Sequence, residues 1–139
     1  MMGTGKRSGD RCGRIAGLTL AKPAEAAAVP ALRHRAAEFA AANGATEELV
    51  ADVALAVSEA VTNVVKYAYS TGVEGVIELS ASAASGWLEI RVRDRGTGFG
   101  QGSSDGLGLG LSIIARICAD MKIVQEGGGT EVQMRFPLA

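Results

Sequence analysis

Two segments in the middle of the chain, 75–82 and 87–94, alternate between apolar and polar residues. The apolar positions are Ile77, Leu79 and Ala81 in the first segment and Leu88, Ile90 and Val92 in the second. A period of two is typical of antiparallel strands that have one face on a core and the other in water. Ser85-Gly86 can supply the turn between them, so the pattern predicts a hairpin.

Other apolar stretches predict the rest of the fold. The expected elements are a strand at 15–22, helices at 28–43, from 46 to about 69 and at 111–119, a glycine-rich loop at 96–110, and strands at 121–125 and 130–137. Thr46 followed by two glutamates is a typical helix start. Because helices must cover the apolar face of the sheet, this order predicts a two-layer α/β (α+β) sandwich with a mixed, mostly antiparallel sheet.

Composition narrows the classes of protein. The 139 residues suit one domain, expected at 15–139, with residues 1–14 as a disordered tail that is rich in glycine and charge. The 14 basic and 15 acidic residues nearly balance, which argues against nucleic acid as the main partner. The sequence has only two cysteines, no apolar run of membrane-spanning length and no signal-peptide pattern. These features predict a cytoplasmic protein without a membrane anchor.

The second predicted helix carries a polar stripe. At about 100° per residue, Glu59, Asn63 and Lys66 fall on one side of this helix, opposite an apolar side that includes Val57 and Val61. A carboxylate, an amide and an ammonium could serve as a base, a Mg²⁺ ligand and a phosphate contact. The alternative is an ordinary solvated helix face.

Asp94 is the second candidate. It follows the phase of Leu88, Ile90 and Val92, so its side chain should point toward the apolar side of its strand. A carboxylate there needs a dedicated partner. Gly96 and Gly98 follow at once, and backbone without side chains can approach a flat ligand closely. The alternative is an aspartate that ends its strand and caps the turn.

The third candidate is the run Gly106-Leu107-Gly108-Leu109-Gly110 before a helix. Free backbone N–H groups at a helix N-terminus bind anions such as phosphate. A Rossmann fingerprint would have to follow a buried strand, and the polar segment 100–105 precedes this run, so that interpretation fails. A flexible glycine turn remains the alternative.

Taken in order, the segments 58–63 (SEAVTN), 94–99 (DRGTGF) and 106–112 (GLGLGLS) resemble the helix box and the two glycine boxes of the GHKL family. This family includes histidine kinases, DNA gyrase, Hsp90-type chaperones and MutL. Gly129-Thr130 resembles the family's final Gly-Thr pair, and the resemblance extends from about Leu18 to the C-terminus. Residues 55–63 (LAVSEAVTN) and Ala68-Tyr69 are most similar to bacterial anti-sigma-factor serine/threonine kinases.

The resemblance implies the Bergerat ATP-binding fold and a role for each candidate. Glu59 would be the general base, Asn63 would bind the Mg²⁺ on the ATP phosphates, and Lys66 would contact phosphate. Asp94 would accept a hydrogen bond from the adenine amino group, supported by Thr130. Gly96 and Gly98 would pass beside the adenine. Gly106, Gly108 and Gly110 would form the phosphate cradle and lid hinge, and Leu107 and Leu109 between them would also bind the nucleotide.

The resemblance also implies partners: a sigma factor that is held inactive, a small STAS-type antagonist that is phosphorylated on serine, and a second copy of the chain in a homodimer. Two alternatives are an ATP-binding regulatory module without kinase activity and a detached histidine-kinase catalytic domain. His34, the only histidine, lies between arginines on a predicted helix and is interpreted as a surface residue.

Overall fold

The computed structural model describes residues 16–69, 75–96, 105–126 and 128–138. The elements in chain order are β2 (Ala16–Pro23), α1 (Ala28–Ala42), α2 (Glu47–Asn63), a π-helical turn η1 (Val64–Ala68), β3 (Val76–Ala84), β4 (Trp87–Asp94), α3 (Asp105–Ile117), β5 (Asp120–Glu126) and β6 (Gly129–Pro137). The expected tail at residues 1–14 lies outside the described residues.

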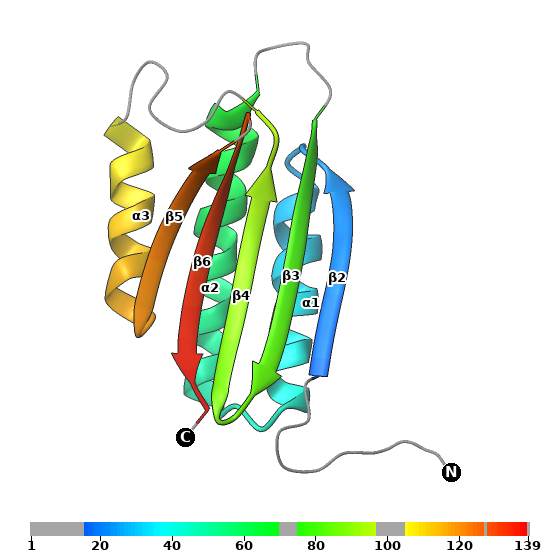
Figure 1. The fold of residues 1–139 in the computed structure, drawn as a ribbon, viewed down its shortest axis with the longest axis vertical. Coiled ribbons are helices and arrows are strands. Elements are labelled where there is room, and N and C mark those ends of the chain that lie inside the picture. The colour runs from blue at the N-terminus through cyan, green and yellow to red at the C-terminus, as the bar shows by residue number, and fades with distance from the viewer. Residues whose placement is uncertain (1–15, 70–74, 97–104, 127, 139) are drawn as a thin grey trace.

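The five described strands form one sheet in the order β2-β3-β4-β6-β5, and all four pairings are antiparallel. The three helices lie together on one face of this sheet, as Figure 1 shows. The predicted two-layer α+β sandwich is confirmed. In the described part of the chain, no helix has the length and apolar character needed to cross a membrane.

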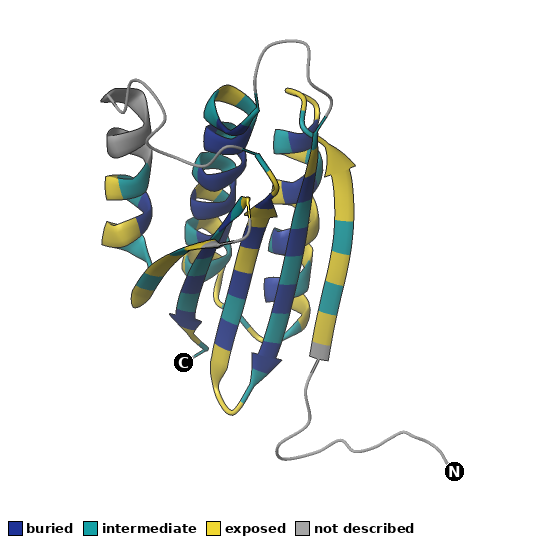
Figure 2. Cartoon of the chain, turned by 45° about the horizontal axis from the view of Figure 1, so that its top comes forward, coloured by how far each residue is buried: buried dark blue, intermediate teal, exposed yellow. Residues whose placement is uncertain are grey.

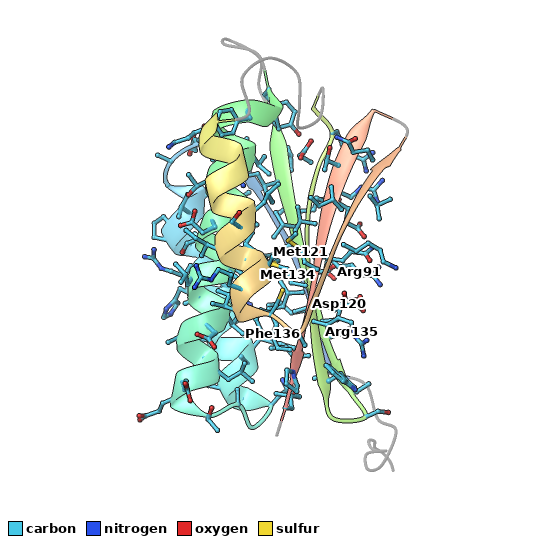
Figure 3. The ribbon with its side chains drawn as sticks, turned by 90° about the vertical axis from the view of Figure 1, so that its left-hand side faces the viewer. Arg91, Asp120, Met121, Met134, Arg135 and Phe136 are labelled. Atoms are coloured by element: carbon cyan, nitrogen blue, oxygen red, sulfur yellow. The ribbon has the colours of Figure 1, made fainter. Side chains whose placement is uncertain are left out.

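The alternating pattern fixes which side chains face the helices. Along β4 and β6 every second residue is buried, and Figure 2 shows this as alternating bands. In Figure 3, Met121, Met134 and Phe136 point toward the helix layer, whereas Arg91 and Arg135 point to the open face. The predicted hairpin turn is present, with positive φ angles of 55° at Ser85 and 82° at Gly86.

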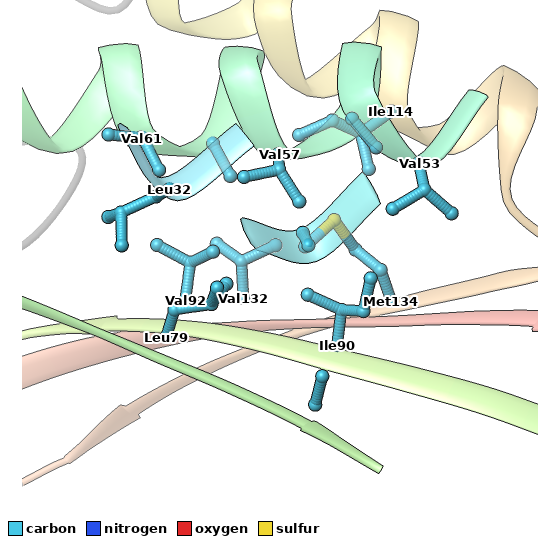
Figure 4. Close-up of a cluster of buried hydrophobic side chains, with 14 of the residues drawn as sticks. Leu32, Val53, Val57, Val61, Leu79, Ile90, Val92, Ile114, Val132 and Met134 are labelled. Atoms are coloured by element: carbon cyan, nitrogen blue, oxygen red, sulfur yellow. The ribbon is translucent and has the colours of Figure 1, made fainter. Parts of the chain in front are cut away.

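The core lies between the sheet and the helices. Val53, Val57 and Val61 of α2 are fully buried, and Figure 4 shows them facing aliphatic side chains of β3, β4 and β6. The predicted helix start is confirmed, because the Thr46 hydroxyl accepts a hydrogen bond of 3.1 Å from the Leu49 N–H. These contacts hold α2 along the middle of the sheet.

Two helix boundaries differ from the sequence-based expectation. The second helix is α-helical only to Asn63 and then widens into the π-helical turn η1. Helix α3 begins at Asp105, not Leu111, and ends at Ile117. Glycine has a poor helix propensity, but propensity is a weak preference that tertiary packing overrides. Here α3 packs against α2 through the buried Ile114.

Candidate functional site

Several elements end or begin at the same end of the sheet, where β4 ends and β6 starts. Helix α2 ends there, β4 ends there, and β6 and α3 begin there, at the top of Figure 1. The side chains that the sequence singled out on α2, β4 and β6 therefore come to one end of the molecule. The segments that bring them together are far apart in the chain.

Three polar side chains are buried at this end: Asn63 on α2, Asp94 on β4 and Thr130 on β6, with exposed fractions of 3%, 1% and 2%. They are the only buried polar or charged residues among those that the structure describes. Each has one atom without a hydrogen-bond partner: Asn63 Nδ2, Asp94 Oδ2 and Thr130 Oγ1. Leaving a buried polar atom unpaired costs about 1–3 kcal/mol of folding free energy. Three such atoms at one end of the sheet therefore indicate a polar ligand.

Asp94 is fixed at one oxygen and unpaired at the other. Its Oδ1 accepts a hydrogen bond of 2.8 Å from the Gly96 N–H, while Oδ2 is buried without a partner. Burial raises the pKa of this carboxyl group above its ordinary value of 3.8, and backbone hydrogen bonds from Gly96 and Thr130 offset part of the rise. Asp94 thus presents a buried hydrogen-bond acceptor that has no partner among the described residues.

Thr130 lies opposite Asp94 in the pairing of β4 with β6. It is buried in the same alternating pattern as Val132, Met134 and Phe136 of β6. Next to it, a Cβ added to Gly129 would lie 2.4 Å from the Asp94 carbonyl oxygen, so only glycine fits there. The pairing of Thr130 with Asp94 places their two side chains next to each other on the same face of the sheet.

The three residues of the predicted polar stripe of α2 differ in how far they are buried. Asn63 is buried, Glu59 one turn earlier is half-buried, and Lys66 is exposed in the π-helical turn. The predicted stripe assumes a continuous α-helix. The wider π-helical turn after Asn63 changes the angle around the helix axis between Asn63 and Lys66. Glu59 and Asn63 are four residues apart on α2 and share a face.

The polar residues at this end of the sheet fit a magnesium ion that is held mainly by phosphate oxygens of a ligand. Within the described ranges no group of three or more His, Cys, Asp or Glu side chains could hold a metal. Mg²⁺ in nucleotide sites commonly has few protein ligands and keeps phosphate and water oxygens. The unpaired amide of Asn63 can supply one such ligand, because a half-turn about its last bond exchanges its nitrogen and oxygen.

The structure describes only some of the predicted site glycines. A Cβ on Gly96 would lie 1.8 Å from the Ala68 carbonyl oxygen, so the described neighbour of this glycine is the end of η1. Gly98 lies outside the described residues. Gly106, Leu107, Gly108, Leu109 and Gly110 were expected in a loop and instead form the first turns of α3. Their position at a helix N-terminus still leaves unpaired N–H groups.

Sequence reasoning gave no role to Tyr69, although its hydroxyl makes three of the hydrogen bonds at this edge. Two shallow hollows of about 460 and 310 Å³ are lined mostly by residues of the open face. The smaller hollow includes Thr130 and Gly129, but neither hollow includes Asn63 or Asp94, so neither one covers all three unpaired atoms.

Removing the buried charge of Asp94 should stabilise the protein without ligand. The pKa of Asp94 is higher in the folded protein than its ordinary value of 3.8. The free energy of unfolding of the wild type therefore falls as the pH rises from about 3.8 through the folded-state pKa. We expect Asp94→Asn to unfold in urea with a free energy about 1 kcal/mol higher than wild type at pH 7. The difference should shrink near pH 4, and a less stable variant at pH 7 would contradict the assignment of a buried, unpaired carboxylate.

Comparison with known proteins gives two kinds of match. The family model described as histidine kinase-like ATPase domain matches residues 22–136. The crystal structure of the RsbU and RsbW domains of Rv1364c from Mycobacterium tuberculosis is 27% identical, with a TM-score of 0.70 over 88% of this chain and 32% of that one. The histidine kinase AdeS of Acinetobacter baumannii shares the fold at 12% identity and a TM-score of 0.51, over 86% of this chain and 68% of that one. No curated protein sequence matches significantly.

Proposed function

Because the chain belongs to the family of histidine kinase-like ATPase domains, we propose that it binds ATP and Mg²⁺ where α2, β4 and β6 meet. The observation that carries the proposal is the set of three buried, unpaired atoms on Asn63, Asp94 and Thr130. Asp94 Oδ2 would accept a hydrogen bond from the adenine amino group, with Thr130 in support. Asn63 would contribute a ligand to the Mg²⁺ on the phosphates.

We further propose that the chain is a protein serine kinase with anti-sigma activity. One of the similar structures contains an RsbW domain, and the chain corresponds to about a third of that structure. The proposed substrate is a serine on a STAS-type antagonist, and the proposed target is a sigma factor held by a homodimer of residues 15–139. A sigma factor works in the cytoplasm, which is therefore the proposed location.

The proposed transfer needs one base and well-placed positive charge. Glu59, half-buried and one turn from Asn63, would accept the proton of the partner's serine hydroxyl. The hydroxyl oxygen would bond to the γ-phosphorus as the bond from that phosphorus to the β–γ bridging oxygen breaks, leaving ADP. Bound Mg²⁺ would offset charge on the phosphates. Lys66 and the N–H groups at the start of α3 would hold the phosphates in place.

Glu59→Gln tests the role of the base. We expect phosphate transfer to fall by about a hundredfold to ten-thousandfold, because glutamine cannot accept the proton. The affinity for ATP should stay within about twofold of wild type, since Glu59 is not proposed to hold the nucleotide. The measurement is acid-stable phosphate on a STAS-domain acceptor, together with calorimetric titration of ATP.

Glu48→Gln is the matched control, because it makes the same change at an exposed position in the first turn of α2. Its transfer rate should equal that of wild type. ATP binding without any transfer would favour the regulatory module. Acid-labile phosphate on a partner histidine would favour the detached histidine-kinase domain.

A further inference from the structure

The hydroxyl of Tyr69 joins two strands at the edge of the site. It accepts a hydrogen bond of 2.9 Å from the Arg95 N–H and donates one of 2.8 Å to the Val76 carbonyl oxygen. The Val76 N–H also lies 3.4 Å from the same oxygen. One side chain from the end of the π-helical turn thus contacts the start of β3 and the residue after β4.

These bonds continue the sheet beyond its last direct pair. The pairing of β3 with β4 ends at Ile77 and Asp94, and Val76 and Arg95 are the next residues along each strand. There, the Tyr69 hydroxyl relays the hydrogen bond from the Arg95 N–H to the Val76 carbonyl. Removing the hydroxyl would leave both groups without this partner.

The ring and the backbone around Tyr69 are tightly packed as well. A Cβ on Gly75 would lie 2.3 Å from Cε2 of the Tyr69 ring, so the chain before β3 lies directly on the ring. On the other side, Gly96 touches the Ala68 carbonyl oxygen so closely that no side chain fits. The end of η1 is therefore fitted against both glycines.

The turn after β4 is held by two successive N–H groups. The Arg95 N–H donates to Tyr69, and the Gly96 N–H donates to Asp94 Oδ1. The second bond fixes the rotation of the carboxyl group and so determines where its unpaired Oδ2 points. If the turn moved, the carboxylate would lose its fixed orientation.

We propose that Tyr69 is a positioning residue: its hydroxyl holds the Arg95–Gly96 turn and thereby aims Asp94 Oδ2 at the base of the nucleotide. The proposal rests on the proposed function for its ligand. Tyr69 would set the preference for adenine over guanine without touching either base. Guanine carries an oxygen where adenine carries the amino group, and a fixed carboxylate repels that oxygen.

The test compares Tyr69→Phe, which keeps the ring against Gly75, with Thr46→Ala. Thr46 also makes a hydroxyl-to-backbone hydrogen bond, but at the opposite end of α2, about 24 Å away at 1.5 Å per residue. Both variants should lower the midpoint of urea unfolding. Only Tyr69→Phe should change the site.

In the protein without nucleotide, amide hydrogen exchange should rise at least about tenfold at Arg95 and also at Gly96 in Tyr69→Phe, and at neither in Thr46→Ala. In calorimetric titrations, Tyr69→Phe should bind ATP about tenfold more weakly, with the ratio of ATP to GTP affinity reduced by a similar factor. Thr46→Ala should keep both values.

Faster exchange at Arg95 alone, with an unchanged ratio of ATP to GTP affinity, would overturn the proposal, because the hydroxyl would then be a local structural bond. An equal loss of affinity for ATP and GTP would overturn it too. If wild type bound no nucleotide, the proposed function would fail. The exchange at Gly96 would still decide whether Tyr69 holds the turn.

Discussion

Asp94→Asn is expected to weaken the binding of ATP and ADP by about a hundredfold. The Gly96 N–H fixes one oxygen of the side chain, so the amide of asparagine must place its nitrogen where Asp94 has its unpaired Oδ2. A donor would then face the amino group of adenine. Losing a hydrogen bond to a charged group and leaving two donors opposed costs about 3 kcal/mol. Calorimetric titration with Mg²⁺ measures the affinity.

The matched control for this variant is Asp120→Asn, the same change at an exposed position at the far end of β5. It should bind ATP as wild type does. GTP gives a second readout, because the asparagine nitrogen can donate to the oxygen of guanine. The ratio of ATP to GTP affinity should therefore fall in Asp94→Asn. Unchanged ATP affinity in this variant would exclude Asp94 from base recognition.

Gly96→Ala is expected to affect both stability and binding. The added Cβ would lie 1.8 Å from the Ala68 carbonyl oxygen and 2.5 Å from the Ala68 carbonyl carbon. These are backbone atoms, so the end of η1 and the turn after β4 must move apart. We expect a loss of about 2–4 kcal/mol in the free energy of unfolding. Because the same turn orients Asp94, ATP affinity should fall at least about tenfold.

Gly17→Ala is the control for this substitution. A Cβ on Gly17 would meet only the Ala81 carbonyl oxygen at 3.8 Å, an ordinary contact. Its free energy of unfolding should stay within about 1 kcal/mol of wild type. Urea unfolding of both variants measures the difference. Equal stability of Gly96→Ala and Gly17→Ala would show that the turn is not packed on η1 as described.

Regular patterns in the sequence predicted the sheet and the inward side chains well. The alternation in β4 placed Leu88, Ile90 and Val92 on the core side, and the same period placed Asp94 there, as the structure confirms. Both predictions depend only on the geometry of an extended strand, which fixes the face of every second residue. The start of α2 was equally predictable, because the Thr46 cap is a local interaction.

Features that depend on tertiary contacts could not be predicted in this way. The π-helical turn at Val64–Ala68 has no sequence pattern of its own and changes where Lys66 lies. The early start of α3 opposes the helix propensity of its glycines. The bonds of Tyr69 to Arg95 join residues 26 positions apart, and no local pattern connects them. The proposed roles of all the site residues, from Glu59 and Asn63 to Asp94, Thr130 and the glycines, stay predictions.

The most direct test of the nucleotide site is calorimetric titration of ATP with Mg²⁺ into the wild-type chain, with ADP and GTP titrated in parallel. The buried, unpaired atoms on Asn63, Asp94 and Thr130 predict one saturable site per chain for ATP and ADP, and much weaker binding of GTP. No saturable binding of ATP up to millimolar concentration would contradict the account.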